Sequence, residues 1–295
     1  MYSYGAPLLA LLILTAVGSA QTKPAKAAKK AAACPVSSFQ PACTLPFDAI
    51  KQTGLAIDKT CGETGCASLQ TPEGKQNKAK NNFCATGSPV TITPDTLAQL
   101  QAAAVAKHIP FGSETDLPTD RNALQQGFTI GGAHLAEGML VRMVAFIIET
   151  HYADLSSGES VNCKVVKATA GNDIHIALGT AYGADECTSV TAEMSPHFRP
   201  VAWNAIAGVL PKDKVTKAPA IAGFPIRVTG QLFFDASHKL CAGGQPTSGD
   251  PARQSLWEIH PVYAADVCKK KDLSSCQVGD ESVWTPLDQW KPAGK

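Results

Sequence analysis

Four pairs of a carboxylate and an imidazole lie in the second half of the sequence, each with its two members two to four residues apart. Side chains of these two kinds bind divalent metal ions and also transfer protons in acid–base catalysis. Two members that are two residues apart on a strand share one face of the sheet. The pairs are Asp173 with His175, Glu193 with His197, Asp235 with His238, and Glu258 with His260.

Three uses of these pairs are open from the sequence. In an alternating strand the polar residues point away from the core, so a carboxylate beside an imidazole can be a cross-strand pair worth about 0.2–1 kcal/mol. The polar face can also bind a ligand. If several pairs converge, they can hold a metal ion or transfer protons. The candidate catalytic or metal-binding residues are Asp173, His175, Asp235, His238, Glu258 and His260.

The usual catalytic sequence motifs are missing. The chain has no G-x-S-x-G nucleophile turn, no H-E-x-x-H zinc helix and no G-x-x-x-x-G-K-[ST] phosphate loop. The sequence therefore favours a binding or structural module that uses an OB-like sheet face, without catalytic activity and without a cofactor. The alternative is a metal-dependent hydrolase, such as a phosphodiesterase, in which a divalent metal held by the candidate residues activates water.

Five segments have the alternation and the β-branched residues that are typical of strands. A segment with helical spacing, residues 200–210, lies between the third and the fourth. Three strands, a helix and two strands is the order of the OB-fold, a five-stranded Greek-key barrel. We therefore predict a mainly β, OB-fold-like barrel, with another small β-barrel or a sandwich as the alternative. The segments are residues 140–153, 172–179, 187–194, 224–235 and 255–267.

The alternation also predicts which side chains enter the barrel. In the last strand, Trp257 and Ile259 should point inward, with Glu258 and His260 together on the outer face. In the fourth strand the apolar residues Ile226, Val228, Leu232 and Phe234 should point inward. The residues expected to point outward there are Arg227, Thr229, Gln231 and Asp235.

The N-terminus has the pattern of a secretion signal, because an apolar run precedes the small residues Gly18, Ser19 and Ala20. The run is about a dozen residues, too short to span a bilayer core of about 30 Å. We divide the chain into a signal peptide at 1–20, a Lys/Ala-rich flexible linker at 21–33, a Cys-rich loop-rich segment at 34–135, the OB-fold-like barrel at 136–268 and a C-terminal tail at 269–295.

One helix is predicted inside the Cys-rich segment, near residues 94–108. Thr93 can cap it and Pro94 suits its first turn. Leu97, Leu100 and Ala104 then share one face at helical spacing.

The ten Cys favour a secreted or periplasmic protein, because disulfide bonds persist in oxidising compartments. The C-x4-C spacing of Cys61 and Cys66 differs from the C-x2-C pairs of structural zinc sites. We therefore predict structural disulfides, and proximity in sequence suggests Cys61–Cys66 and Cys163–Cys187. No transmembrane segment is expected in the mature chain.

The charge distribution indicates which class of partner the protein binds. Residues 1–33 contain four Lys and no acid, which leaves 22 basic against 25 acidic residues in the remainder. A slightly acidic body lacks the basic surface that binds nucleic acid through its phosphates. The expected partners are therefore a saccharide, an envelope polymer or another protein, and nucleic acid is disfavoured.

Five sequence motifs, in this order, resemble a family of uncharacterised exported bacterial proteins with an OB-fold-like domain. Its members share a D-x-H strand, an acid in strand three, a V-x-G-x-L-x-x-D-x-x-H segment and a terminal W-E-I-H-P-V. "AKNNFCA", Ala79 to Ala85, resembles the family's N-terminal part. The resemblance spans roughly residues 60–266 and implies the fold and export but no reaction. Here an insert separates the last two motifs, and its Cys241 suggests a bridge to Cys268. The motifs are GESVNC, NDIHIAL, VTAEMSPHFRP, RVTGQLFFDASH and RQSLWEIHPV.

Overall fold

Five strands close a barrel in the computed structural model, which describes residues 1, 39, 58–59, 61–153, 163, 171–208, 221–247 and 251–291. The strand order around the barrel is β4-β5-β6-β8-β7, and β7 pairs again with β4. The β6–β8 pairing is parallel, and the other four pairings of the barrel are antiparallel. This confirms the OB-fold-like barrel. The strands are β4 (Leu140–Tyr152), β5 (Ile174–Gly179), β6 (Val190–Met194), β7 (Pro225–Phe234) and β8 (Trp257–Cys268).

The connection between β6 and β7 contains the expected helix in a shortened form. It is a single 3-10 helix, η5 (Val201–Ile206), whose Trp203 and Ile206 side chains are buried in the barrel core. Part of the predicted helical segment, residues 209–210, lies outside the described residues. The predicted signal peptide and linker also lie outside them, apart from Met1.

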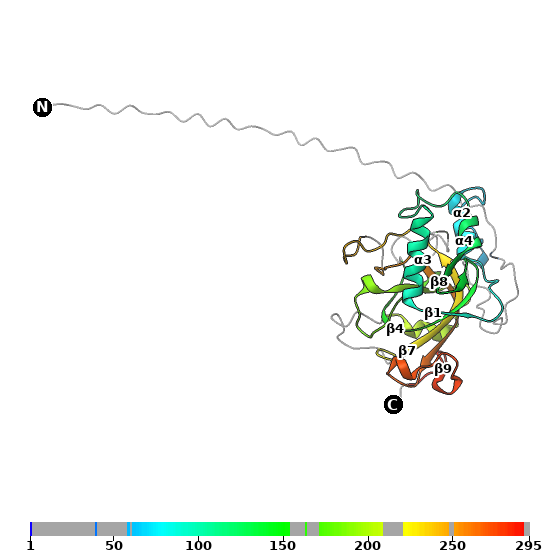
Figure 1. The fold of residues 1–295 in the computed structure, drawn as a ribbon, viewed down its shortest axis with the longest axis vertical. Helices are drawn as coiled ribbons and strands as arrows, with labels where there is room; N and C mark the ends of the chain where they lie inside the picture. The colour runs from blue at the N-terminus through cyan, green and yellow to red at the C-terminus, as the bar shows by residue number, and fades with distance from the viewer. Residues whose placement is uncertain are drawn as a thin grey trace. The chain divides into compact units, whose positions relative to one another are not determined.

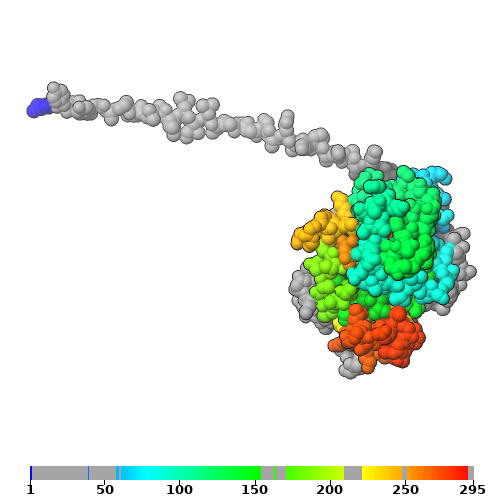
Figure 2. All heavy atoms as spheres, viewed as in Figure 1, coloured from blue at the N-terminus to red at the C-terminus, as the bar shows by residue number. Residues whose placement is uncertain are grey.

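The N-terminal elements pack on the barrel and share its core. The helix α3 (Pro94–Ala106) begins with the predicted Thr93 cap, and its Leu97 and Leu100 are fully buried. Figures 1 and 2 show the cyan and green N-terminal elements across the near face of the barrel. The other elements before the barrel are α2 (Pro72–Lys80), β1 (Val90–Ile92), α4 (Asn122–Gln126), β2 (Phe128–Ile130) and β3 (Ala133–Leu135).

Shorter elements complete the described chain. The strand β1 extends the sheet by parallel pairing with β4, and β9 (Trp284–Pro286) pairs with the end of β8. The remaining 3-10 helices are η4 (Glu186–Thr188), η6 (Leu273–Ser275) and η7 (Glu281–Val283). Among the described helices, none is long and apolar enough to cross a membrane.

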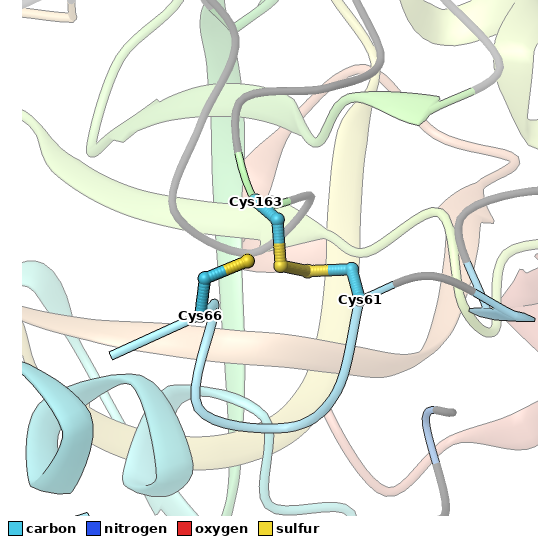
Figure 3. Close-up of side chains that lie close together, drawn as sticks. All are labelled: Cys61, Cys66 and Cys163. Atoms are coloured by element: carbon cyan, nitrogen blue, oxygen red, sulfur yellow. A yellow bond between two sulfur atoms is a disulfide. The ribbon is translucent and has the colours of Figure 1, made fainter. Parts of the chain in front are cut away.

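The disulfide bonds differ from all three predicted pairs. Cys61–Cys66, Cys163–Cys187 and Cys241–Cys268 are wrong, because the bonds join Cys61 to Cys163, Cys187 to Cys241 and Cys268 to Cys276. Cys61 lies 102 residues from its partner, and Figure 3 shows Cys66 beside that bond. Proximity in sequence failed for Cys61, Cys163 and Cys187 because the fold brings together loops that lie 102 and 54 residues apart. The bonds agree with a protein that folds outside the cytoplasm.

The barrel bends where β7 crosses β8, and Gly230 permits the close approach. The register between the two strands shifts on both sides of Gly230. A Cβ atom at this position would lie 2.4 Å from the carbonyl oxygen of Pro261 and 2.6 Å from the Ile259 side chain. Any side chain at position 230 would therefore push the two strands apart.

We expect Gly230→Ala to reduce the free energy of unfolding by about 1–3 kcal/mol, the usual cost of overpacking a core. Urea unfolding followed by tryptophan fluorescence measures the change. Gly279→Ala is the matched control, since nothing lies within 4 Å of a Cβ atom added there. Equal stability of the two variants would show that the strand crossing tolerates a methyl group.

Candidate functional site

The candidate residues lie on the outer face of the barrel, as predicted, but this face is buried. Asp173, Glu258 and His260 have no exposed area, and His175 is 6 % exposed. The fourth strand behaves in the same way, because all ten residues of β7 are buried, polar and apolar alike. The outer face therefore belongs to a second, polar interior between the barrel and the elements that cover it.

Strands β5, β6 and β8 bring two of the predicted pairs, Asp173–His175 and Glu258–His260, together around one carboxylate, that of Glu193. The β5–β6 register places His175 opposite Glu193, with His175 Nε2 3.1 Å from Glu193 Oε1. From β8, His260 Nδ1 lies 2.6 Å from Glu193 Oε2. His260 Nε2 lies 4.0 Å from Asp173 Oδ2, and His260 Nδ1 lies 3.7 Å from Glu258 Oε1. The polar face thus forms one connected cluster.

A lysine that the sequence did not single out completes this cluster. Lys80 is the last residue of α2, and its side chain reaches the barrel face. Its ammonium lies 3.0 Å from Glu193 Oε2 and 3.5 Å from Asp235 Oδ2. Burial alone would lower the pKa of Lys80, but the charges of Glu193 and Asp235 outweigh it and hold the pKa well above its usual value. Lys80 is therefore a buried cation.

The helix α2 could not be recognised from an apolar pattern because its buried face is polar. The buried residues are Gly74, Gln76, Asn77 and Lys80, and they share the side facing the barrel because Gly74 and Asn77 lie six and three residues before Lys80 and Gln76 lies four before it. An amphipathic helix is normally found by its apolar stripe, which α2 lacks. The only sequence signal was the AKNNFCA segment, where Lys80 falls inside the resemblance.

Asp235 is held ionised by several donors at the end of β7. Its Oδ1 accepts hydrogen bonds from Gln76 Nε2 at 3.0 Å, from the Ser237 amide at 3.0 Å and from the Ser237 hydroxyl. Burial raises the pKa of Asp235, but the charges of His238 and Lys80 outweigh it, so the pKa lies well below its usual range. The predicted Asp235–His238 pair forms at the edge of the cluster, at 3.6 Å. Burial and the Arg253 guanidinium lower the pKa of His238 to about 4.

The pKa values of the remaining ionisable groups of the cluster are shifted in opposite directions. Burial and then the nearby charge of Glu193 raise the pKa of Glu258 well above its usual value, although Arg253 Nη1 lies 3.2 Å from its Oε2. Burial also raises the pKa of Glu193, but the charges of His175, Lys80 and His260 outweigh this and hold it well below its usual value. Burial and then the charge of Lys80 lower the pKa of His260.

A second buried ion pair adjoins the cluster and was also missed by sequence reasoning. Arg121 bonds Glu137 through two nitrogens, one of them at 2.7 Å, and its Nη2 donates to the Phe234 carbonyl. Gln76 joins the two groups, because its Oε1 accepts from Arg121 Nη1 at 3.2 Å while its Nε2 donates to Asp235. The polar residues of α2 thus connect two buried charge networks.

The fourth predicted pair, Glu193 with His197, does not form. β6 ends at Met194, so His197 lies in the following turn and points elsewhere. Its Nδ1 lies 2.5 Å from Asp58 Oδ1, and its ring stacks on Phe39 with 3.9 Å between the ring centroids. His197 therefore holds N-terminal residues against the barrel instead of completing the cluster.

An open pocket lies beside α2, adjoining the buried networks. Its volume is about 530 Å³. Five of its lining residues carry side-chain amides, and its acidic and basic side chains are equal in number. Asn81 Oδ1 has no hydrogen-bond partner among the described residues. The amides are Asn81, Asn82, Asn122, Gln125 and Gln231, and the charged residues are Glu63, Asp120, Glu137, Lys75, Lys78 and Arg121.

The chain has no significant match among protein-family models, curated proteins or solved structures. The resemblance to the family of exported bacterial proteins therefore stays a prediction. The arguments about function rest on the geometry of this chain alone.

We expect Lys80→Met to reduce the free energy of unfolding by about 3–5 kcal/mol, because it leaves buried carboxylates without their cation. Urea unfolding at neutral pH measures the loss. Lys78→Met is the matched control on the same helix, since Lys78 is about half exposed and pairs with Glu63 at 3.3 Å. Such exposed pairs contribute about 0–1 kcal/mol. Similar losses in both variants would contradict the role given to Lys80.

The lowered pKa of Asp235 predicts how stability depends on pH. Its ionised form is favoured in the folded state, so its contribution is fully present above the unfolded pKa of about 4 and is lost as pH falls through the folded pKa. Asp235→Asn should therefore be less stable than the wild type at pH 7, and its stability should fall less steeply below about pH 4. Urea unfolding over a pH series tests this, and identical slopes would contradict it.

Proposed function

We propose that the protein is an exported binding module that holds a polar, uncharged ligand of the saccharide class in the pocket beside α2. The observation that carries this proposal is the amide lining of that pocket. Side-chain amides offer both donors and acceptors, which matches the hydroxyl groups of a saccharide. A volume of about 530 Å³ falls in the range of small-molecule sites.

The charge balance of the pocket supports a neutral ligand. Lys78 lies 3.3 Å from Glu63, and Arg121 is bonded to Glu137, so these charges are paired within the protein. A phosphate-bearing ligand would need several unpaired basic groups. Among the described lining residues only Lys75 is a base without an acidic partner, and its Nζ donates to the Thr119 carbonyl at 2.7 Å. Gln125 and Asn122 are exposed on α4, where their amides are accessible to a ligand.

The face that OB-folds commonly use for ligands is a poorer candidate in this chain. That face lies on the outside of the second and third strands, here β5 and β6. Its polar residues His175 and Glu193 are buried, and Lys80 of α2 occupies the space in front of Glu193. We therefore place the ligand on the outer side of the covering helix.

The alternative function is a metal-dependent hydrolase, such as a phosphodiesterase. One observation favours it, because Asp173, Glu193 and His260 each offer a ligand atom within 4.8 Å of the others. The three side chains have no exposed area, however, and a substrate must reach the metal for hydrolysis. We therefore prefer the binding function.

We expect Gln125→Trp to block the pocket and to weaken ligand binding by about tenfold or more, because a bulky ring replaces a flexible amide at the rim. A glycan array identifies a ligand for the wild-type protein, and calorimetry measures its affinity for the variants. Gln289→Trp is the matched control, an exposed glutamine that does not line the pocket. The proposal fails if the array shows no glycan binding, or if both variants bind equally well.

A further inference from the structure

Two disulfide bonds approach each other at Cys61, Cys66 and Cys163. The sulfur atoms of these three residues all lie within 4.8 Å of one another. Cys61 and Cys163 are bonded to each other, and Cys66 is disulfide-bonded as well, so the bond of Cys66 is a different one. A sulfur atom of one disulfide therefore lies against the other disulfide.

The three sulfur atoms are arranged for an exchange of partners. Thiol–disulfide exchange begins when a thiolate attacks one sulfur of a disulfide, and the other sulfur then leaves. In Figure 3 the sulfur of Cys163 lies between those of Cys61 and Cys66, so an attack by Cys66 on Cys163 expels Cys61. The Cys66 sulfur has to move by at most about 3 Å to reach the S–S bond length of about 2.05 Å.

The turn at residues 62–65, between two of the cysteines, is held in place by α2. Asn77 Nδ2 donates a hydrogen bond to the Thr64 carbonyl at 3.0 Å, and Asn81 Nδ2 donates one to the Glu63 carbonyl at 2.9 Å. Both asparagines are buried. These hydrogen bonds fix the turn against the helix, and they thereby keep the two cysteines at its ends close to the third.

The backbone and the exposure of the cysteines favour reaction at Cys66. Cys66 has a φ of 68° and Cys163 a φ of 56°, in the left-handed region that residues with a side chain rarely adopt. Disulfides that are strained or exposed are the ones that thiols reduce most readily. Cys66 is half-buried, whereas Cys61 has no exposed area, so a thiol in solution can reach the sulfur of Cys66 but not that of Cys61.

We propose that Cys61, Cys66 and Cys163 form a thiol–disulfide exchange site whose co-reactant is a low-molecular-weight thiol. In the first step the thiolate of the small thiol attacks the disulfide of Cys66, forms a mixed disulfide with the other cysteine of that bond, and releases Cys66 as a thiolate. In the second step Cys66 forms a bond to Cys163. The electron pair of the broken Cys61–Cys163 bond leaves with Cys61, which takes a proton from water. Each step conserves the number of disulfides, so no oxidant is needed.

The exchange moves a thiol from an accessible position to a buried one. Before the second step the reactive sulfur is that of Cys66, and after it the thiol is that of Cys61, which has no exposed area. A buried thiol is protected from alkylating agents and oxidants. The connection between β4 and β5 stays attached, at residue 66 instead of residue 61. The exchange site does not depend on the saccharide proposal, since none of the three cysteines lines the pocket beside α2.

The test is to follow the disulfide pattern of the oxidised full-length protein during partial reduction. Reduced glutathione is added at about pH 8 until about one new thiol per chain appears. Samples are quenched with acid, labelled with light N-ethylmaleimide while folded and with its deuterated form after unfolding, and mapped as non-reduced peptides. We expect a Cys66–Cys163 bond, with the deuterated label on Cys61. The absence of a Cys66–Cys163 bond at every time and glutathione concentration overturns the proposal.

Two matched variants test the exchange without an added thiol. Cys61→Ser leaves Cys163 as a thiol beside the disulfide of Cys66, and Cys276→Ser leaves Cys268 as a thiol. Among the described residues, Cys268 belongs to no comparable group of three cysteines. We expect Cys163 to be bonded to Cys66 in most chains of the first variant, and Cys268 to stay a thiol in the second. A free Cys163, or equal rearrangement in both variants, overturns the proposal.

The time course on the wild type covers the case in which Cys61→Ser does not fold. Because the attacking group is a thiolate, the Cys66–Cys163 bond should form about tenfold faster or more for each pH unit below the ordinary pKa of a thiol, about 8.5. Because the exchange is intramolecular, its rate should not change when the protein is diluted. A rate that is independent of pH, or one that falls with protein concentration, overturns the proposal. Neither experiment measures glycan binding, so the two proposals fail independently.

Discussion

The contact of the Lys80 ammonium with Glu193 and Asp235 is the constraint on which the rest of the structure depends. A barrel face with four buried carboxylates cannot be covered by an apolar helix, because the cost of removing charges from water has to be offset by opposite charge and hydrogen bonds. The helix α2 meets this requirement with Lys80 and Gln76, which reach Glu193 and Asp235. The N-terminal segment is thus a covering layer whose polar residues match those of the barrel, and the two parts share an interior.

The helix α2 lies between the buried cluster and the open pocket. Its inner face binds Asp235, while Lys75, Lys78 and Ala79 line the pocket. Gln231 of β7 takes part in both, since its Nε2 donates to the carbonyls of Ala79 and His260 and the residue also lines the pocket. A ligand that shifts α2 would therefore act on the charges beneath it, and the charges in turn fix the shape of the pocket wall.

The sequence predicted the barrel because the period of two in its strands is a direct consequence of strand geometry, and the Thr93 cap marked α3 equally well. It also predicted that Asp173, His175, Glu258 and His260 lie on the outer face. Alternation predicts which side chains point away from a barrel core but not what covers them. The burial of that face and the role of Lys80 as its counter-ion therefore could not be predicted. The Cys61–Cys163 bond and the contact of His197 with Asp58 join distant segments, for which a single sequence carries no local signal.

The Cys61–Cys163 bond has a consequence for how the polar face can be uncovered. It joins the chain before α2 to the connection between β4 and β5. A covering helix tethered in this way cannot diffuse away when its contacts break, so its effective concentration at the barrel stays high and it closes again rapidly. Any opening of the cluster by α2 is therefore a hinged, reversible movement about a covalent anchor, and reduction of this bond would lengthen the tether of α2 and slow its return to the barrel face.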